Sequence, residues 1–386
     1  MFLMCAIRVF GKFLVCYWDV IGQHSVRPIV LSVKCKFQLL SYMAARSNSR
    51  MTAGGQDARI NASILRFTIE ATNHCAFFTL EDMEFIFIDD CTKDRSMEVL
   101  AKVMEECRGR FEEMRWTVRR ERMERNSGLP AVRRRGVELA CGEYIVHCDS
   151  DDWTDRDMYR LMYEKAHAEG LDAVFCDHYR AVGSGQWAVG SEGNYDNDVN
   201  RHVRTFPWVE IDKQRAFDSM FADNQGYHSL WSAMYRATLY GKVSEFPRNN
   251  MGEDTALTAQ LLYFARTVGY IPQPLYYYRQ REGSIVQTLS VEKRWENVRQ
   301  LMQNQELIIR FFEQQQVEEK YIVFAKLTAR FALEGLRKEK GFREAWRSCY
   351  PEIARRIVCN KDIRPGVRVK FFLLDSGLHR VIYKRS

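Results

Sequence analysis

Short apolar runs that end in acidic residues recur in the middle of the chain. One run, EFIFI at residues 84–88, is followed directly by Asp89 and Asp90, and a second, YIVHC at residues 144–148, is followed by DSDDW. An uninterrupted apolar run of this length, bounded by polar residues, is typical of a strand that is buried on both faces. The pattern therefore predicts two buried strands, each delivering carboxylates to the loop at its carboxyl end.

Segments with helical character separate these runs. They cover residues 96–106 and 155–169, and residues 125–142 are expected to form a loop that leads into a third helix. Residues 172–181 resemble another strand. Strands that alternate with helices at this spacing predict an α/β fold with a mostly parallel sheet flanked by helices. Because ligands bind such sheets at the carboxyl ends of the strands, both acidic loops are expected to face one site.

The second acidic loop gathers Asp149, Asp151 and Asp152 within four positions. Two carboxylates about 4 Å apart repel each other by roughly 4 kcal/mol at an effective dielectric constant near 20. A solvated turn or helix cap tolerates such a cluster. A divalent cation would offset the repulsion, since Mg²⁺ accepts carboxylate ligands beside phosphates and water. The position at a strand end favours a metal or nucleotide site over a turn.

Composition narrows the class of protein. The chain has 386 residues, of which 46% are hydrophobic and 28% charged, as in ordinary globular domains. Its 11 cysteines are scattered, which favours reduced thiols in the cytoplasm over a disulfide framework or a zinc site. The apolar N-terminal stretch is interrupted by Arg8, Lys12 and Asp19, so it predicts no membrane span.

The net charge of +7 is concentrated near the C-terminus. From Lys320 onward 17 Lys and Arg stand against six Asp and Glu, a net charge of +11, which leaves −4 for the rest of the chain. Basic residues there interleave with apolar ones such as Phe372, so the segment fits two interpretations. It would dock peripherally on the inner face of an anionic membrane, or it would pack on its own domain with a solvated basic face. Nucleic acid is not expected as a partner, because no recognised binding motif accompanies the charge.

Four blocks of the chain carry a family resemblance when they are taken in order: EFIFIDDCTKDRS, NSGLPAVRRRGVELACGEYIVHCDSDDW, WSAMYRATLY and MGEDTALTAQLLYFARTVGYIPQPLYYYRQREGSI. Together they resemble the nucleotide-sugar glycosyltransferases of the GT-A fold, specifically the large inverting family 2. The resemblance implies a GT-A, Rossmann-like α/β fold with a helical C-terminal extension. It divides the chain into a divergent N-terminal segment over residues 1–78, a GT-A domain over residues 79–290 and a helical, basic region over residues 291–386.

The resemblance also implies a donor site. Asp149 and Asp151 would hold Mg²⁺ or Mn²⁺ against the diphosphate of a UDP- or GDP-sugar, and Asp149 would thereby contact the donor. Asp89 and Asp90 would accept hydrogen bonds from the nucleoside. Arg133 would add positive charge near the phosphates.

On the acceptor side, the resemblance makes Asp254 the base that takes the proton of the acceptor hydroxyl, with Glu253 as the neighbour that could replace it. Trp231 would stack on the acceptor sugar. Each of these residues also has a structural interpretation, since acids favour the N-terminus of a helix and tryptophans are often core residues. Five other residues near these motifs are expected to be packing residues of the core: His147, Cys148, Tyr276, Tyr277 and Tyr278.

The resemblance is incomplete on its N-terminal side, where the likeness begins near Thr79. The family's first strand ends in a Pro-x-Tyr-Asn-like segment that cradles the base. PIVLSVKCKF, residues 28–37, is a candidate strand, but it lacks that signature and stands too far upstream of Glu84. Cys91 and Lys93 also replace small and polar residues expected after the Asp-Asp pair.

The predicted function is transfer of a sugar, with inversion, from a nucleoside-diphosphate donor to a saccharide or glycolipid acceptor in cell-surface polysaccharide synthesis. Two alternatives stay open. A transferase-like protein with an impaired nucleotide site would act as a binding module. An apolar strand followed by Asp-x-Asp also opens the sites of aspartate-nucleophile phosphatases, although those favour Thr or Val where this chain has Trp153.

Overall fold

The structure, a computed structural model, describes residues 78–149, 152–182, 200–222, 226–280, 290–359 and 365–378. It also describes the backbone of three strands further upstream, β1 (Arg8–Val9), β2 (Lys12–Phe13) and β3 (Ile29–Cys35). Most of the predicted N-terminal segment, residues 1–78, and the end of the basic tail lie outside the described residues.

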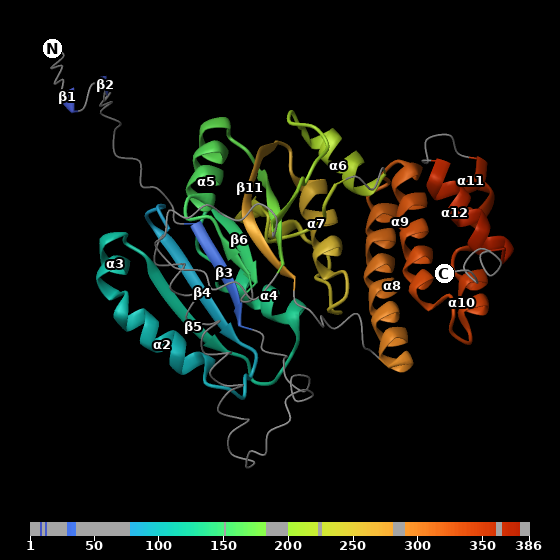
Figure 1. Cartoon of the computed structure of the whole chain (residues 1–386), viewed down its shortest axis with the longest axis horizontal. Helices are drawn as coiled ribbons and strands as arrows, with labels where there is room; N and C mark the ends of the chain where they lie inside the picture. The colour runs from blue at the N-terminus through green and yellow to red at the C-terminus, as the bar shows by residue number, and fades with distance from the viewer. Residues whose placement is uncertain are drawn as a thin grey trace.

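Nine strands of the described chain form one mixed sheet (Figure 1). In spatial order they are β5 (Thr117–Arg122), β4 (Met83–Asp89), β3, β6 (Tyr144–Asp149), β10 (Ala233–Arg236), β8 (Ala173–Val182), β11 (Val268–Gln280) and β7 (Trp153–Thr154), with β9 (Asn200–Val203) paired to β8. The pairs β5–β4, β4–β3, β3–β6 and β8–β11 are parallel. β10 lies antiparallel between β6 and β8, and β7 and β9 are antiparallel to their partners.

The candidate strand at residues 28–37 forms β3, which lies between the two acidic strands. Ile29 is in register with Met83 of β4, and Val30 is in register with Ile145 of β6. The expectation that this segment stands too far upstream of Glu84 to serve as the first strand beside β4 was wrong. Parallel strands need a crossover connection of a dozen or more residues, and the entropic cost of a longer connection grows only slowly with its length.

The apolar run of β4 shows how the sheet is buried. Phe85 and Phe87 pack in one hydrophobic cluster, while Ile86 and Ile88 pack in a second cluster on the opposite face. The two-residue period of a strand produces this division, and a strand covered on both faces has no polar side. The predicted α/β fold of the GT-A type, with a mainly parallel sheet flanked by helices, is confirmed.

Helices cover both faces of the sheet (Figure 1). The first cluster is closed by α2 (Ser96–Glu106), α3 (Arg108–Glu113) and α5 (Met158–Glu169). The second is closed by α4 (Leu129–Leu139), α6 (Lys213–Phe221) and α7 (Glu253–Phe264), with the short 3₁₀ helix η1 (Ala237–Lys242) at the end of β10. The helix expected from residue 155 begins at Met158 instead, because the Asp155 amide donates to the carbonyl of Leu275, 2.7 Å away, and holds the chain in a turn at the edge of the sheet.

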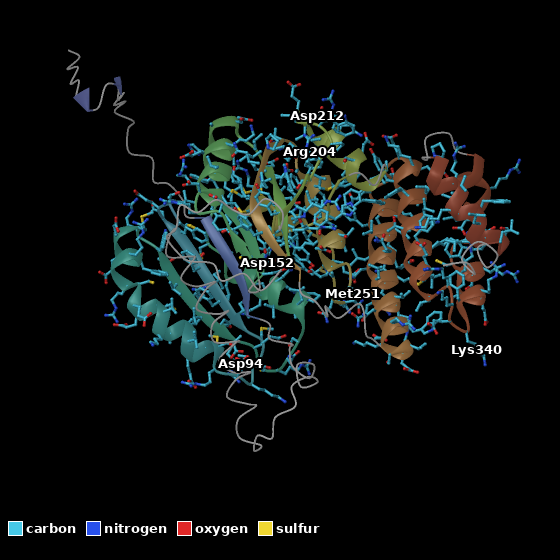
Figure 2. The ribbon with its side chains drawn as sticks, in the orientation of Figure 1. Asp94, Asp152, Arg204, Asp212, Met251 and Lys340 are labelled. Carbon is cyan, nitrogen blue, oxygen red and sulfur yellow. The ribbon has the colours of Figure 1, made fainter. Side chains whose placement is uncertain are left out.

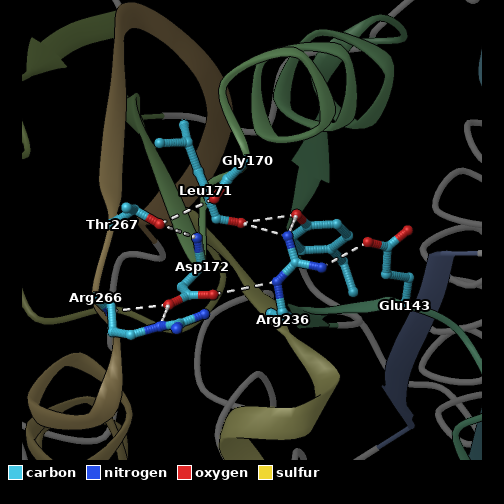
Figure 3. Close-up of polar contacts among 8 residues, drawn as sticks. Glu143, Gly170, Leu171, Asp172, Arg236, Arg266 and Thr267 are labelled. Atoms are coloured by element: carbon cyan, nitrogen blue, oxygen red, sulfur yellow. Dashed lines mark hydrogen bonds and ion pairs between the residues drawn. The ribbon is translucent and has the colours of Figure 1, made fainter.

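A polar network joins the strands at the edge where β6, β8 and β11 begin (Figure 3). The Asp172 carboxylate accepts hydrogen bonds from Arg236 Nε at 3.2 Å and from the Arg266 amide at 2.9 Å. Arg236 also donates to Glu143, 2.6 Å away. The acidic loops follow the carboxyl ends of β4 and β6, at the other edge of the sheet. The network therefore stabilises the sheet without contacting the acidic loops.

The C-terminal region is helical, as predicted (Figure 1). It comprises α8 (Val291–Gln314), α9 (Glu319–Ala332), η2 (Leu333–Leu336), α10 (Phe342–Ser348), η3 (Pro351–Ile353), α11 (Ala354–Cys359) and α12 (Pro365–Ser376). Residues of α8 and α9 belong to the same hydrophobic cluster as α6 and α7, whereas α10–α12 pack around Trp346 and Phe371 in a cluster of their own. The first two helices are therefore continuous with the core of the sheet domain.

Candidate active site

Arg133 of α4 connects two of the predicted acidic segments. Its Nε donates to Oε1 of Glu253 at 3.1 Å, and its Nη2 donates to Oδ1 of Asp149 at 3.2 Å. Arg133 is only 4% exposed, and this burial by itself disfavours its charge. The negative charges of Glu253, Asp149 and Asp254 outweigh the burial and hold the pKa of Arg133 above its ordinary value. The guanidinium therefore stays charged and ties the end of β6 to the start of α7.

Asp254 follows Glu253 in the first turn of α7, as its interpretation as a helix N-terminus predicts. Its Oδ1 accepts a hydrogen bond from the amide of Thr255 at 2.8 Å. Burial raises the pKa of Asp254, and the charge of Asp149 raises it further, while the Thr255 amide and Arg133 act in the opposite direction. A carboxylate with a raised pKa is a better proton acceptor near neutral pH.

Asp89 and Asp90 are buried at the end of β4, and both carboxylates hold loops. Asp89 accepts from the amide of Thr92 at 2.7 Å and pairs with Arg122 at 2.8 Å. Asp90 accepts from the backbone amides of residues 127 and 128, at 2.7 and 2.9 Å, in the loop that leads into α4. The predicted contacts of Asp89 and Asp90 with a nucleoside stay a prediction. The structure shows that the two carboxylates bind backbone amides of the loops that follow β4 and precede α4.

The three acids of the second loop differ in their surroundings. Asp151 lies outside the described residues. Asp152, which Figure 2 labels near the middle of the molecule, is buried and accepts a hydrogen bond from the Tyr276 hydroxyl at 2.8 Å. The Asp149 side chain is 22% exposed and is bound on one oxygen by Arg133. Within the described part of the chain, no cluster of three His, Cys, Asp or Glu side chains forms a complete metal site.

Trp231 is buried among aromatic rings. Its ring stacks on Tyr276 with centroids 4.2 Å apart and lies parallel to Tyr278 at 5.6 Å. This packing agrees with the interpretation of Trp231 as a core residue. Its predicted contact with an acceptor sugar stays a prediction. Tyr276, Tyr277 and His147 are buried too, which confirms the expectation that they are packing residues. Burial, followed by the charge of Arg133, lowers the pKa of His147 well below its ordinary value.

Three further polar residues near Trp231 were not singled out from the sequence. Arg180 of β8 hydrogen-bonds to Tyr227, and the charges of Asp254 and Asp152 also act on that hydroxyl, whose pKa is raised mainly by burial. His178 lies 4.8 Å from the Trp231 ring, and neither of its buried nitrogens has a partner among the described residues. Burial, with Arg180 and His202, lowers the pKa of His178 to about 3. The one signal in the sequence is that His178 and Arg180 stand two apart in β8 and so share a strand face whose other residues are apolar.

These residues come from the ends of β4 and β6, from α4 and from the start of α7 on a mixed sheet covered by helices. This arrangement is a GT-A fold, the class of α/β domain on which glycosyltransferases act on nucleotide-sugar donors. The S. aureus protein TarS, residues 1–349 in complex with UDP-GlcNAc, superposes with a TM-score of 0.53 at 14% identity, covering 90% of this chain and 81% of that one. At this identity the likeness shows the fold alone.

Sequence comparison finds similarity to one family over slightly less than half of the chain. Residues 59–242 match the family described as Glycosyl transferase family 2, a match that begins ahead of Thr79. The chain is 29% identical over 216 residues to "Putative glycosyltransferase EpsH" of Bacillus subtilis, covering 54% of this chain and 56% of that one. It is 25% identical over 280 residues to "Succinoglycan biosynthesis protein ExoO" of Rhizobium meliloti, covering 68% of this chain and 66% of that one. In fold and in sequence the chain is therefore similar to family 2 glycosyltransferases.

The match spans little more than half the length of EpsH, so it does not carry over everything that protein does. Over the ranges that the structure describes, no helix combines the length and the apolar character needed to cross a bilayer.

Proposed function

We propose that this glycosyltransferase moves a sugar with inversion from a nucleoside-diphosphate donor to a saccharide or glycolipid acceptor, in the assembly of a surface polysaccharide. The observation that carries the proposal is the bridge of Arg133 between Asp149 and Glu253. Through this bridge Asp149, the acid at the predicted donor side, and Glu253, the neighbour of the predicted base Asp254, lie on either side of one buried cation. The similarity to ExoO, a protein named for succinoglycan biosynthesis, supports a polysaccharide product.

The proposed reaction is a single displacement. The acceptor oxygen attacks the anomeric carbon of the donor, the bond from that carbon to the phosphate oxygen breaks, and the bonding electron pair leaves with the diphosphate. The hydroxyl proton passes to the carboxylate of Asp254, whose raised pKa suits it to the task. Attack opposite the leaving group inverts the anomeric centre.

The residues present fit a divalent cation at the end of β6. Asp149 is partly exposed and offers carboxylate oxygen, the ligand type that Mg²⁺ prefers. Asp152 fits less well, because it is buried and hydrogen-bonded to Tyr276. Asp149 would therefore hold the cation together with Asp151, and the cation would stabilise negative charge on the leaving diphosphate.

A donor screen tests the proposal. The full-length protein is incubated with UDP- and GDP-sugars and candidate saccharide or glycolipid acceptors, with Mn²⁺ or Mg²⁺ and with EDTA, and the anomeric configuration of any product is assigned by NMR. Metal-dependent transfer with inversion is expected. Hydrolysis of phosphomonoesters would favour the phosphatase alternative instead, and a folded protein that neither transfers a sugar nor binds a nucleotide would be a binding module.

The basic C-terminal region adds a proposed partner, an anionic membrane surface. Its last described helix, α12, exposes Val369 and Phe372 at 58% and 49%, and Leu378 just after it is 47% exposed. Lys370 of the same helix is exposed too and pairs with Glu334 of η2 at 2.7 Å. Apolar side chains beside cations suit shallow insertion between anionic headgroups. Co-sedimentation with phosphatidylserine vesicles, lost in Phe372→Ser and at high salt, is the expected result. Equal binding to neutral phosphatidylcholine vesicles would contradict it.

A further inference from the structure

The loop of residues 249–252, directly before Glu253, lies against α8 of the C-terminal region. The Asn304 side chain on α8 donates from its Nδ2 to the carbonyl of Asn249 at 2.9 Å and to the carbonyl of Met251 at 2.8 Å. Asn304 is 1% exposed, so water does not compete for these bonds. Met251 is labelled in Figure 2, between the sheet domain and the C-terminal helices.

The other side of the loop is fixed to α4, the helix that carries Arg133. Asn250 Oδ1 accepts a hydrogen bond from the Leu129 amide at 2.9 Å. Leu129 begins α4, and the first amides of a helix have no partner within the helix. The loop therefore caps α4 with one side chain while two of its carbonyls bind α8, and it fixes the distance between the two helices.

Gly252 leaves this arrangement little freedom. Its φ of +74° lies in the left-handed region, and a Cβ placed there would come within 2.5 Å of Leu301 Cδ1, one turn before Asn304 on α8. Only this glycine separates the Met251 carbonyl, which Asn304 holds, from Glu253. A shift of the loop therefore passes directly to the first turn of α7.

We propose that Asn304 is a positioning residue for the transfer reaction: by holding the loop of residues 249–252 it sets where Glu253 meets Arg133 and where Asp254 faces the acceptor. This proposal rests on the proposed function for its chemical consequence. It makes α8, which lies after the sheet domain in the sequence, part of the catalytic unit. By fixing the first turn of α7, the same clamp limits how far water reaches Asp254, which is partly buried and whose pKa this burial raises.

The test compares Asn304→Ala with Asn304→Gln, which keeps the donor group, and with Phe312→Leu as a matched control. Phe312 is buried on the same helix but packs on Phe217, Phe221 and Tyr321, away from the loop. The measurements are kcat and donor KM, the dependence of kcat on pH, and amide hydrogen exchange over residues 249–256, all at matched folded fractions.

Asn304→Ala is expected to lower kcat about 10- to 100-fold, the scale of an ångström-sized misplacement, while donor KM changes little. The acid limb of the kcat profile should move to lower pH, because water reaching Asp254 relieves the burial that raises its pKa. Exchange should accelerate over residues 249–256. Asn304→Gln should recover part of each change, and Phe312→Leu should show none of them.

The proposal is overturned if Asn304→Ala and Phe312→Leu match in kcat, in acid limb and in exchange over the loop. That result would leave the proposed function intact. If wild-type protein transfers no sugar, the proposed function fails on its own. The exchange rates still test whether Asn304 holds the loop in that case. Faster exchange over residues 249–256 in Asn304→Ala alone supports this role, and unchanged exchange refutes it.

Discussion

Replacing Arg133 by Met is the sharpest perturbation that the site offers. Met keeps much of the length and apolar volume of the side chain but removes the charge and both hydrogen bonds. The variant leaves Glu253, which is 4% exposed, as a buried acid without its guanidinium partner. It also separates Asp149 from the start of α7.

The expected loss of stability follows from the geometry. At separations of 3.1 and 3.2 Å, each ion pair has a Coulomb energy of about 5 kcal/mol at an effective dielectric constant near 20. Much of that energy is offset by the desolvation of the three groups in the wild-type protein. Removal of one partner from a buried pair costs about 3–5 kcal/mol, because the remaining charge stays buried without compensation. We expect Arg133→Met to lose that amount at pH 7.

Urea denaturation of Arg133→Met, Glu253→Gln and the double variant measures this loss and its origin. If loss of the guanidinium from buried Glu253 is the cause, the double variant should recover most of the loss, and the cycle should give a coupling energy of several kcal/mol. The acid limb of kcat should move to higher pH in Arg133→Met, since the charge of Arg133 lowers the pKa of Asp254 in the wild type. A loss below about 1 kcal/mol with additive single variants would refute the reasoning.

Further predictions concern the acids and the opposite edge of the sheet. Asp151→Ala should abolish transfer and the metal dependence of nucleotide binding, which calorimetry with and without Mn²⁺ would check; full activity would end its assignment as a ligand. Asp254→Asn should lower kcat by about 10²- to 10⁴-fold. Because the folded-state pKa of Asp254 is raised, its stabilising contribution is complete below the unfolded-state pKa and disappears as pH rises through the folded-state value. Asp254→Asn should therefore gain stability relative to wild type at pH 7 but not at pH 3, and denaturation at both pH values shows whether it does. Arg236→Ala should cost about 1–3 kcal/mol, because buried Asp172 loses one of its two cationic partners and keeps Arg266, with kcat unchanged at matched folded fraction; a selective fall in kcat would show that the network reaches the site.

The elements and the fold class were predictable because local signals agreed with the tertiary arrangement. The run EFIFI is apolar on both faces of β4, and the structure packs its alternate residues in two different clusters. The segment at residues 96–106 forms α2 with those bounds. Strand ends in a parallel sheet share one edge, so a sequence that places acids after β4 and β6 already indicates where a site should lie.

The partners of the site residues were not predictable in the same way. Arg133 was expected near phosphates, yet the structure binds it to Asp149 and Glu253, which are 16 and 120 positions away in the chain. Nothing in the local sequence encodes such a pairing, because helix and strand periods report which side of an element is buried and not which charge it meets. The pairing of β3 with β4 was missed for a related reason. The distance in sequence between two parallel strands says little about whether they pair.

The acidity of Asp254 joins these features, because two opposing influences act on it. Burial at the start of α7 raises its pKa, and the nearby cation Arg133 lowers it. The first influence depends on the loop that α8 holds through Asn304, and the second depends on α4. Arg133→Met and Asn304→Ala should therefore move the acid limb of kcat in opposite directions, although both disturb the same carboxylate. A general loss of structure would not separate the two variants by sign, so the pair distinguishes control of the base from damage to the fold.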